Sequence, residues 1–381
     1  MARAFIIAGE PSGDKLAATL MKAAQPEITS WSGIGGPLME AQGLPASDDY
    51  ETLHIIGAIQ ALRQFSALKA LLKRLVDEAA ALRPDYIFTI DSKVFSLRFA
   101  KDIKKRMEEE GWHAPIIHMV APTIWYYGAG RKTAFETHFD AMLCLFPMEP
   151  PLFDKTALKT IFIGHPAAYV SKAQQRHIEQ DKPLHLALLP GSRRSEVAAL
   201  LPTFLRSAAS LKKYNDMVIT IATLPHLEAM VRRYCKMIDV KAEIVTGEAA
   251  LMKTLQRSHF MMASSGTMTL ETALSALPGL VGYKLNWLMT QIMRWRVKQP
   301  DPILPNIILS KPVYPFFLNQ QVESLKLSAA STILLTNYET KQQEHFEKAN
   351  ILQKMLVTDA PDFQSAISNA LTSLGIKKAA K

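Results

Sequence analysis

The first half of the chain alternates short apolar runs with stretches of helical periodicity. The opening apolar run, 4–8, leads through a glycine-containing turn into a helix-like stretch at 15–24. The pattern returns where the apolar run 86–90 precedes a helix-like stretch at 96–110. Further strand-like runs are 29–31, 116–120, 141–146 and 160–164. Strands that alternate with helices of this length predict a parallel sheet with right-handed crossover connections.

The same alternation restarts in the second half. A polar stretch within 165–183 carries no strand pattern and is interpreted as a linker. An apolar run at 185–189 then precedes a helix-like stretch at 196–211. Further apolar runs are 217–222, 242–246, 260–263 and 279–283. Beyond Pro312 the pattern is helical, without strands, up to a basic tail at 377–381.

The two alternating halves predict an α/β protein of two doubly wound, Rossmann-like domains, with ligands at the carboxyl ends of the strands. We expect an N-terminal domain at 1–167, a second domain at 183–311 and a helical C-terminal segment at 312–381. The length of 381 residues fits two domains of roughly 150 residues or a little more.

Composition narrows the class of protein. Hydrophobic residues make up 48% and charged residues 21% of the chain, which excludes a disordered chain, a collagen and a disulfide scaffold. The net charge of +9 indicates an anionic partner: nucleic acid, an anionic membrane surface or a phosphorylated small molecule. Cys144 and Cys235 lie in apolar stretches, which favours buried thiols in a reducing compartment. Without a secretory signal or an apolar run of about 18 residues, we expect a cytoplasmic protein, soluble or peripherally bound to a membrane.

Two strand-to-helix turns in the second half carry residues suited to a phosphate group. In one turn Gly191, Ser192 and Arg193 stand where a helix begins, so backbone N–H groups, the helix dipole and a guanidinium all favour an anion. The other turn has hydroxyl groups followed by a carboxylate suited to ribose hydroxyls, and its candidates are Ser265, Gly266, Thr267 and Glu271. Ordinary capping explains either turn alone. Both turns in one domain favour a nucleotide-diphosphate site.

The first half carries small-residue turns and a carboxylate at strand ends. Glycines let a backbone approach a ligand closely or adopt positive φ, and tight turns explain them equally well. The candidates in these turns are Glu10, Ser12, Gly13, Gly35 and Gly36. Asp91 follows the apolar run 86–90, where a partly desolvated carboxylate suits a general base and equally suits a helix cap. His165 is a further pocket candidate, whereas His118 within a strand is typical of a core histidine.

Several common signatures are absent from the sequence. It has no Walker A pattern and no GxGxxG, so nucleotide hydrolysis and hydride transfer are disfavoured. No Cys/His or carboxylate cluster has metal-ligand spacing, so we expect no metal and no cofactor. No nucleic-acid-binding module is recognisable, so we expect no nucleic-acid partner and keep a nucleic-acid binder as the non-enzyme alternative.

A series of motifs, in order along both halves, resembles the lipid-A-disaccharide synthase family of GT-B glycosyltransferases. The matching segments are AGEPSGD (8–14), GIGGPLMEAQG (33–43), TID (89–91), FIGHP (162–166), LLPGSRRSEV (188–197), SSGTMTLE (264–271), VGYKLNW (281–287) and LPNIIL (304–309). The first two are specific to the family, whereas LLPGSR and SGTMTLE are shared with related sugar-nucleotide enzymes. The resemblance therefore supports the fold and the donor more than the acceptor.

The resemblance implies two domains facing a cleft and an inverting, metal-independent transfer. UDP-2,3-diacylglucosamine would donate its sugar to 2,3-diacylglucosamine 1-phosphate (lipid X), giving the β-1,6-linked disaccharide 1-phosphate precursor of lipid A and UDP. It also implies a peripheral location on the anionic surface of the inner membrane. Asp91 matches the catalytic aspartate of the family, Glu271 would orient the uridine ribose and Asn306 would contact the donor. The oligomeric state is left open, a homodimer included.

The chain departs from the family pattern on the acceptor side. Asp91 is followed by Ser-Lys-Val-Phe at 92–95, where the family usually has Ala-Pro-Asp-Phe. Gln60 stands where glutamate is common, and residues 125–127 read Trp-Tyr-Tyr instead of Trp-Ala-Trp. Because the nucleotide-side motifs are intact, we expect the same chemistry with altered acceptor recognition. Lys93 is a candidate contact for the 1-phosphate of the acceptor.

Two stretches combine helical apolar spacing with basic side chains, as interfacial helices do. Residues 60–76 carry leucines interleaved with cations, and packing in the domain core explains that stripe equally well. Residues 286–298 bring two Trp beside three cations, which favours a membrane interface.

A UDP-N-acetylglucosamine 2-epimerase or another UDP-GlcNAc transferase on the same fold is the alternative activity.

Overall fold

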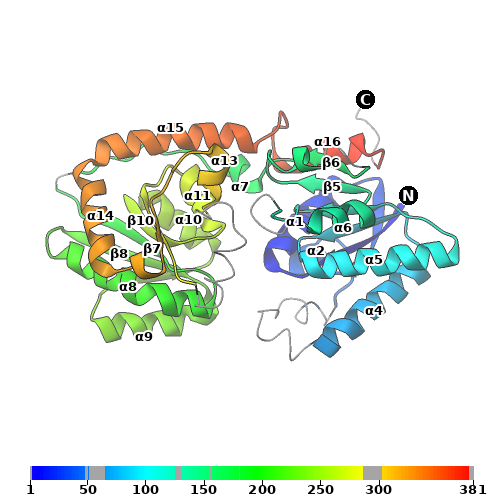
Figure 1. Ribbon diagram of the computed structural model, residues 1–381, viewed down its shortest axis with the longest axis horizontal. Helices are drawn as coiled ribbons and strands as arrows, with labels where there is room; N and C mark the ends of the chain where they lie inside the picture. The colour runs from blue at the N-terminus through cyan, green and yellow to red at the C-terminus, as the bar shows by residue number, and fades with distance from the viewer. Residues whose placement is uncertain are drawn as a thin grey trace. The chain divides into compact units, whose positions relative to one another are not determined.

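The structure is a computed structural model that describes residues 2–47, 50, 65–124, 130–153, 157–179, 181–285 and 303–376. The chain forms two compact units (Figure 1). The first unit is Met1–Tyr169 together with Leu356–Lys381, and the second is Val170–Met355. The C-terminal segment is thus divided between the two units.

The first unit is built on a parallel sheet of strand order β2-β1-β3-β4-β5-β6. Its strands are β1 (Ala2–Ala8), β2 (Ile28–Ile34), β3 (Tyr86–Ile90), β4 (Ile116–Met119), β5 (Ala141–Cys144) and β6 (Lys159–Phe162). Its helices are α1 (Pro11–Ala23), α2 (Pro37–Glu40), α4 (Phe65–Leu82), α5 (Lys93–Glu110), α6 (Arg131–His138), α7 (Pro166–Val170) and α16 (Phe363–Ser373). Apolar runs that the sequence assigns to strands form this sheet.

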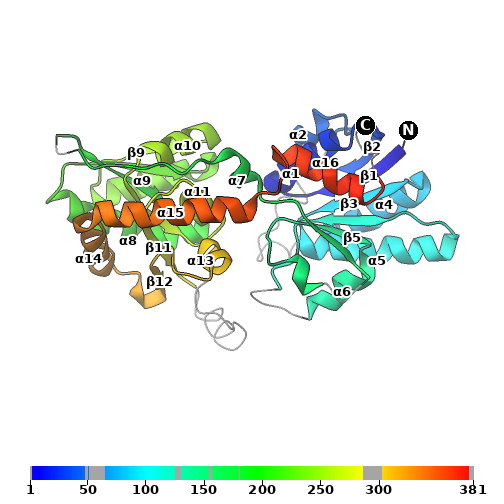
Figure 2. The same ribbon diagram turned by 90° about the horizontal axis from the view of Figure 1, so that it is seen from above.

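Both faces of the first sheet are covered, because successive residues of a strand point to opposite faces. Ala4 and Ile6 of β1 pack in one apolar cluster with α1 and α16, whose neighbouring positions Figure 2 shows. Phe5 and Ile7 pack in a second cluster with α4 and α5. A strand buried on both faces reads as a continuous apolar run, which is why the sequence predicts these strands so directly.

The second unit is built on a parallel sheet of strand order β12-β11-β10-β7-β8-β9. Its strands are β7 (Leu184–Leu189), β8 (Met217–Thr223), β9 (Glu243–Thr246), β10 (Phe260–Ser264), β11 (Gly279–Tyr283) and β12 (Phe316–Leu318). Its helices are α8 (Arg194–Lys212), α9 (Glu228–Ile238), α10 (Glu248–Arg257), α11 (Met268–Leu274), α13 (Leu304–Leu309), α14 (Ser324–Thr336) and α15 (Tyr338–Leu356). Numbered within the unit, this is the 3-2-1-4-5-6 order of a Rossmann fold.

The expectation of no strand beyond Pro312 is wrong. β12 lies in that segment and pairs in parallel with β11, with Val281 opposite Phe316. The segment is otherwise helical, and its helices are shared out: α14 and α15 belong to the second unit and α16 to the first. A three-residue strand leaves too short an apolar run for the sequence pattern to identify.

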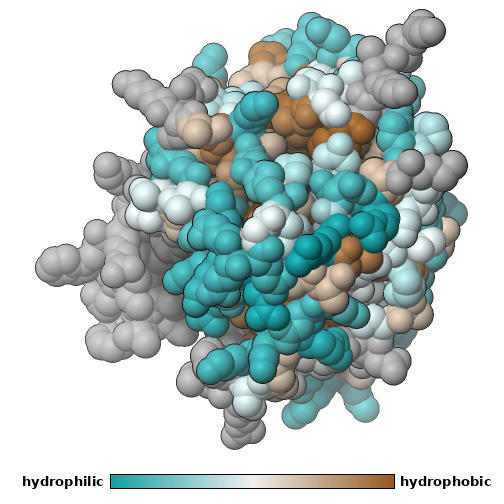
Figure 3. All heavy atoms as spheres, turned by 90° about the vertical axis from the view of Figure 1, so that its right-hand side faces the viewer, coloured by the Kyte–Doolittle hydropathy of each residue, from teal (hydrophilic) through white to brown (hydrophobic). Residues whose placement is uncertain are grey.

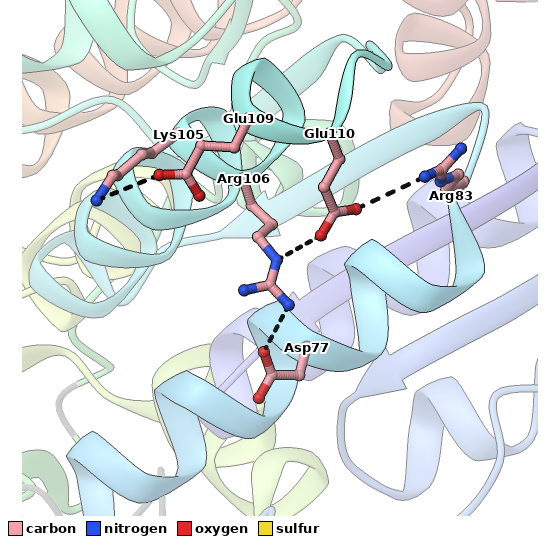
Figure 4. A network of polar contacts seen from close by, with 6 residues as sticks. All are labelled: Asp77, Arg83, Lys105, Arg106, Glu109 and Glu110. Carbon is pink, nitrogen blue, oxygen red and sulfur yellow. Dashed lines mark hydrogen bonds and ion pairs between the residues drawn. The ribbon is translucent and has the colours of Figure 1, made fainter.

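The contact between α4 and α5 combines an apolar interior with an exposed ionic rim (Figure 4). Arg106 of α5 donates through Nε to Glu110, 2.6 Å, and its Nη2 lies 3.4 Å from Asp77 of α4. Glu110 also lies 3.8 Å from Arg83, just after α4. Exposed ion pairs add little to stability, so the leucines beneath them hold the two helices together.

The described part of the stretch 60–76 belongs to the core. Leu71, Leu72 and Leu75 of α4 are buried in the cluster that α4 shares with α5. Of the two interpretations of this stripe, the structure therefore supports core packing. Gln60 and the ranges 125–127, 286–298 and 377–381 lie outside the described residues.

On the side of the first unit seen in Figure 3, hydrophobic residues appear as separate groups among hydrophilic ones. In the part of the chain that the structure describes, none of the helices has the length and hydropathy to cross a membrane.

Candidate active site

Each sheet has one topological switch point, where the chain leaves neighbouring strands in opposite directions and ligands bind at the carboxyl edge. In the first unit this point lies between β1 and β3, and the turns that follow them begin at Gly9 and Asp91. In the second unit it lies between β7 and β10, and the turns there contain Gly191 and Gly266. The structure thus brings the candidates of each unit to one edge of its sheet.

Three of the eight described non-glycine residues with positive φ lie around Asp91. Asp91 and Ser92 have φ values of 48° and 41°, and Val120, at the end of the adjacent strand β4, has a φ of 80°. Positive φ is unusual for residues with a Cβ, and a branched side chain makes it more costly. Such strained residues cluster at functional sites, where the surrounding structure holds them in place.

The backbone of Asp91 is held on both sides. Its N–H donates to the carbonyl of Met119, 2.9 Å, and its own carbonyl accepts from the Ser96 hydroxyl, 2.8 Å. The side chain of Asp91 is partly exposed, and from the described residues its carboxylate receives no hydrogen bond. The N-cap of α5 is Ser92, and no side chain caps this helix. The structure therefore does not use Asp91 as a helix cap.

Lys93 and His118 lie close enough to interact electrostatically. His118 is fully buried, and its Nδ1 forms a 2.8 Å hydrogen bond with the hydroxyl of Thr89. Burial, and then the charge of Lys93, lowers the pKa of His118 to about 3. His118 is therefore a neutral core residue, while Lys93 begins α5 two residues after Asp91.

The glycine turns of the first unit lie at the same edge of the sheet. Glu10 is the exposed N-cap of α1, Ser12 is exposed on its first turn and Gly13 is buried. A Cβ atom on Gly13 would lie 3.7 Å from the carbonyl oxygen of Ile90, directly before Asp91. Gly35 and Gly36 are buried between β2 and α2. The structure thus brings the turn after β1 against the strand end that carries Asp91.

His165 follows β6, and its ring and backbone contact neighbouring residues of the first unit. Its ring stacks on Phe146 with centroids 5.4 Å apart, and its Nδ1 accepts a hydrogen bond from the N–H of Ala167, 3.2 Å. Its backbone N–H donates to the carbonyl of Leu356, 2.8 Å. Burial lowers the pKa of His165 to about 4. The side chain is therefore neutral near neutral pH and accepts, rather than donates, through Nδ1.

The turn after β7 differs from expectation in the partner of its arginine. Gly191 has a φ of 110°, and Ser192 and Arg193 are exposed. Nη1 of Arg193 donates to the carboxylate of Glu196, 3.1 Å, on the first turn of α8. A Cβ atom on Gly191 would overlap this carboxylate. The carboxylate of Glu196 thus pairs with the guanidinium that the sequence assigns to a phosphate.

The turn after β10 is shaped by its own hydroxyl groups. Thr269 donates through its hydroxyl to the carbonyl of Gly266, 2.7 Å, which fixes the start of α11. Gly266 and Thr267 are exposed, whereas Ser265 and Glu271 are partly buried. The candidates of this turn therefore lie at the surface of the switch point.

Asn306 is buried at the third residue of α13, and its side chain binds backbone groups. Its Oδ1 accepts from the N–H groups of Val313 and Tyr314, 2.8 and 3.2 Å, and its Nδ2 donates to the carbonyl of Tyr314, 3.3 Å. These bonds tie α13 to the segment that leads into β12. Contact between Asn306 and the donor stays a prediction.

Sequence reasoning missed the contacts that two side chains, Glu196 and Asp14, make at these edges. Glu196 pairs with Arg193, and its charge adds to burial in raising the pKa of Tyr283 at the end of β11. Asp14, on the first turn of α1, is buried. Glu196 lies on the first turn of α8, where a carboxylate suits the positive end of the helix dipole, and the sequence contains that signal. For the contacts of Asp14 no local signal exists.

Among the described residues, no group of three or more His, Cys, Asp or Glu side chains is placed to hold a metal ion.

Comparison with known proteins decides the family. The family model of lipid-A-disaccharide synthetase matches residues 4–360. The chain belongs to this family. It is thereby a member of a glycosyltransferase family of lipid A biosynthesis.

Relatives match along most of their length. The lipid-A-disaccharide synthase of Rhodospirillum centenum is 32% identical over 354 residues, covering 89% of this chain and 86% of that protein. That of Chromobacterium violaceum is 32% identical over 348 residues, covering 87% of this chain and 88% of that protein.

Solved structures show the fold. UDP-GlcNAc 2-epimerase from Neisseria meningitidis, bound to UDP-GlcNAc, superposes with a TM-score of 0.60 at 12% identity, covering 98% of this chain and 100% of that chain. MurG from Acinetobacter baumannii superposes with a TM-score of 0.56 at 11% identity, covering 97% and 98%. The chain has two parallel-sheet α/β domains of the GT-B type.

Proposed function

We propose that this lipid-A-disaccharide synthetase family member transfers the sugar of UDP-2,3-diacylglucosamine to 2,3-diacylglucosamine 1-phosphate (lipid X). The products are the β-1,6-linked disaccharide 1-phosphate and UDP. The observation that carries the proposal is the position of the family motifs. AGEPSGD and TID in the first unit, and LLPGSRRSEV and SSGTMTLE in the second, lie at the switch point where such folds bind ligands.

Asp91 is the general base of the proposed reaction. Its carboxylate takes the proton of the acceptor hydroxyl as that oxygen attacks the anomeric carbon of the donor. The bond from the anomeric carbon to the UDP oxygen breaks, its electron pair leaves with UDP and the configuration inverts. The strained backbone around Asp91 and the hydrogen bonds that hold it support this role, because a base needs a fixed position.

The turn 191–193 stabilises the negative charge of the departing diphosphate. The N-terminal N–H groups of α8 and the guanidinium of Arg193 supply positive charge where that charge develops. Diphosphate binding requires Arg193 to exchange Glu196 for a phosphate oxygen. Ser265, Gly266 and Thr267 line the second turn, and Glu271 orients the ribose.

The residues that bind the acceptor substrate in this proposal belong to the first unit. Lys93 begins α5 beside Asp91 and binds the 1-phosphate of the acceptor in this proposal. Glu10, Ser12 and the glycine turn at Gly35 complete the acceptor side. The protein acts at the anionic surface of the inner membrane as a peripheral cytoplasmic enzyme, because both substrates carry acyl chains. We further propose that the transfer needs no metal ion.

The deciding experiment incubates the purified protein with UDP-2,3-diacylglucosamine and lipid X in detergent micelles. Mass spectrometry should detect the disaccharide 1-phosphate and UDP in equal amounts, with the same rate in excess EDTA. Loss of activity on chelation, restored by Mg²⁺ or Mn²⁺, would contradict the metal-independent mechanism. Absence of the disaccharide under all these conditions would refute the proposed function.

Two control incubations address the alternatives. Soluble UDP-GlcNAc without an acceptor tests 2-epimerase activity, which the shared fold with the epimerase from Neisseria meningitidis makes the natural comparison. An oligonucleotide titration tests the nucleic-acid alternative raised by the net charge of +9. The family match over residues 4–360 supports the transferase over both alternatives.

Size-exclusion chromatography with light scattering tests for a homodimer.

A further inference from the structure

We propose that Asp14 is a positioning residue for the acceptor substrate, an inference that rests on the proposed function. Asp14 is only 3% exposed. Its Oδ1 accepts hydrogen bonds from the backbone N–H groups of Gly36 and Met39, 3.1 and 3.0 Å, and its Oδ2 accepts one from Leu38, 3.0 Å. A single side chain of α1 thus holds the turn after β2 and the start of α2.

The three donors explain how a carboxylate is buried at this place. Burial of a charged group is costly unless hydrogen bonds satisfy it, and bonds from backbone N–H groups to a carboxylate are among the stronger ones. Asp14 is therefore committed to the backbone of residues 36–39. This commitment distinguishes it from Asp91, whose carboxylate receives no hydrogen bond from the described residues.

The first turn of α1 joins this glycine turn to the end of β3. Asp14 contacts Gly36, while Gly13 packs against the carbonyl of Ile90, directly before Asp91. The position of the glycine turn relative to Asp91 is thus set through two consecutive residues of α1. A substrate whose hydroxyl must meet Asp91 while its body contacts the glycine turn depends on this spacing.

The turn that Asp14 holds is closely packed on one side and open on the other. A Cβ atom on Gly36 would lie 2.6 Å from Oδ2 of Asp14 and 2.7 Å from Cζ of Tyr50, so only glycine fits. The phenol of Tyr50 lies within the electrostatic reach of Asp14 and Glu10. Burial, and then the charges of these two carboxylates, raises the pKa of Tyr50. Leu38, on the same turn, is 48% exposed. The turn therefore presents an apolar side chain beside polar groups, which suits an acylated sugar.

The test compares kinetic constants for the two substrates in Asp14→Asn. Asparagine keeps the shape but replaces one acceptor oxygen with an N–H₂ donor that faces backbone N–H groups. We expect the acceptor KM to rise about tenfold, while the donor KM and the UDP affinity by calorimetry change by less than about twofold. Leu38→Ala, at an exposed position, should retain the fold and raise the acceptor KM in the same direction.

Asp140→Asn is the matched control. Asp140 also accepts a backbone hydrogen bond in the first sheet, from the N–H of Ile116, 2.7 Å, but at the amino ends of β4 and β5. Its loss should lower the melting temperature and leave both KM values unchanged. This separates positioning of the acceptor from stability of the unit.

The outcomes are distinct. A normal wild-type rate with an unchanged acceptor KM in both Asp14→Asn and Leu38→Ala overturns the inference alone. Should Asp14→Asn fail to fold, an unchanged acceptor KM in Leu38→Ala overturns it equally. Absence of transfer by the wild-type protein refutes the proposed function, and the inference with it.

Discussion

The guanidinium of Arg193 lies 3.1 Å from the carboxylate of Glu196, on the first turn of the helix that begins at the proposed diphosphate site. The side chain of Arg193 is 74% exposed, whereas that of Glu196 is only 14% exposed. The carboxylate also lies against Gly191. In the proposed function a diphosphate competes with Glu196 for the same guanidinium, so we expect the pair to limit affinity for the nucleotide.

The first prediction concerns Arg193→Ala. It removes a charge-assisted contact to the diphosphate, so UDP binding should weaken by about 1.5–3 kcal/mol. Isothermal titration calorimetry with UDP measures this directly. The neighbouring exposed Arg194→Ala is the control and should bind UDP as the wild type does. Unchanged affinity in Arg193→Ala would remove this residue from the nucleotide site.

Glu196→Gln should have the opposite effect. The substitution releases Arg193 and removes a negative charge from beside Gly191, so UDP should bind up to about fivefold more tightly, the range of an exposed ion pair. The same calorimetric titration measures it, and a double-mutant cycle with Arg193→Ala tests the coupling. Weaker binding in Glu196→Gln would show instead that Glu196 orients the guanidinium.

Asp91→Asn tests the base. Asparagine keeps the size of the side chain but cannot accept the proton, so turnover should fall by about 10²–10⁴. UDP affinity should be unchanged, because the nucleotide turns belong to the second unit. Asp102→Asn, an exposed position on α5, is the control for the substitution itself. Turnover above about a tenth of the wild-type value would exclude Asp91 as the base.

Lys93→Ala tests recognition of the acceptor phosphate. Removal of this ammonium should raise the acceptor KM and leave the donor KM nearly unchanged. An acceptor without the 1-phosphate should show no difference between the variant and the wild type. Equal loss with both acceptors would contradict a phosphate contact by Lys93.

The stability of the first unit should fall in mild acid because of His118. Burial lowers the pKa of His118 from 6.5 to about 3, so the unfolded chain binds a proton below about pH 6.5 that the folded chain does not. The contribution to stability is therefore present above that pH and is lost as the pH falls toward 3. Urea unfolding at about pH 7.5 and about pH 5 should show a smaller difference for His118→Phe than for the wild type. His113→Gln, at an exposed site, should behave as the wild type.

The sequence by itself determined the described strands other than β12, and the turns that follow them. The apolar runs 86–90 and 279–283 coincide with β3 and β11, because a parallel strand buried on both faces needs consecutive apolar residues. A turn after such a strand must lie at the carboxyl edge of the sheet. This rule places Asp91 and Gly191 at the carboxyl edges of their sheets. The strand order then shows that both edges are switch points.

Only the tertiary structure decided what covers each apolar face and which polar groups meet. The leucine stripe of α4 reads the same for a core as for a membrane surface, because periodicity records that a face is apolar but not what packs on it. β12 exists because β11 offers an edge to pair with. Asp14 finds its backbone donors 22 to 25 residues along the chain, which no local pattern encodes. Contacts of this kind form only when folding brings distant segments together, so the local sequence carries no signal for them.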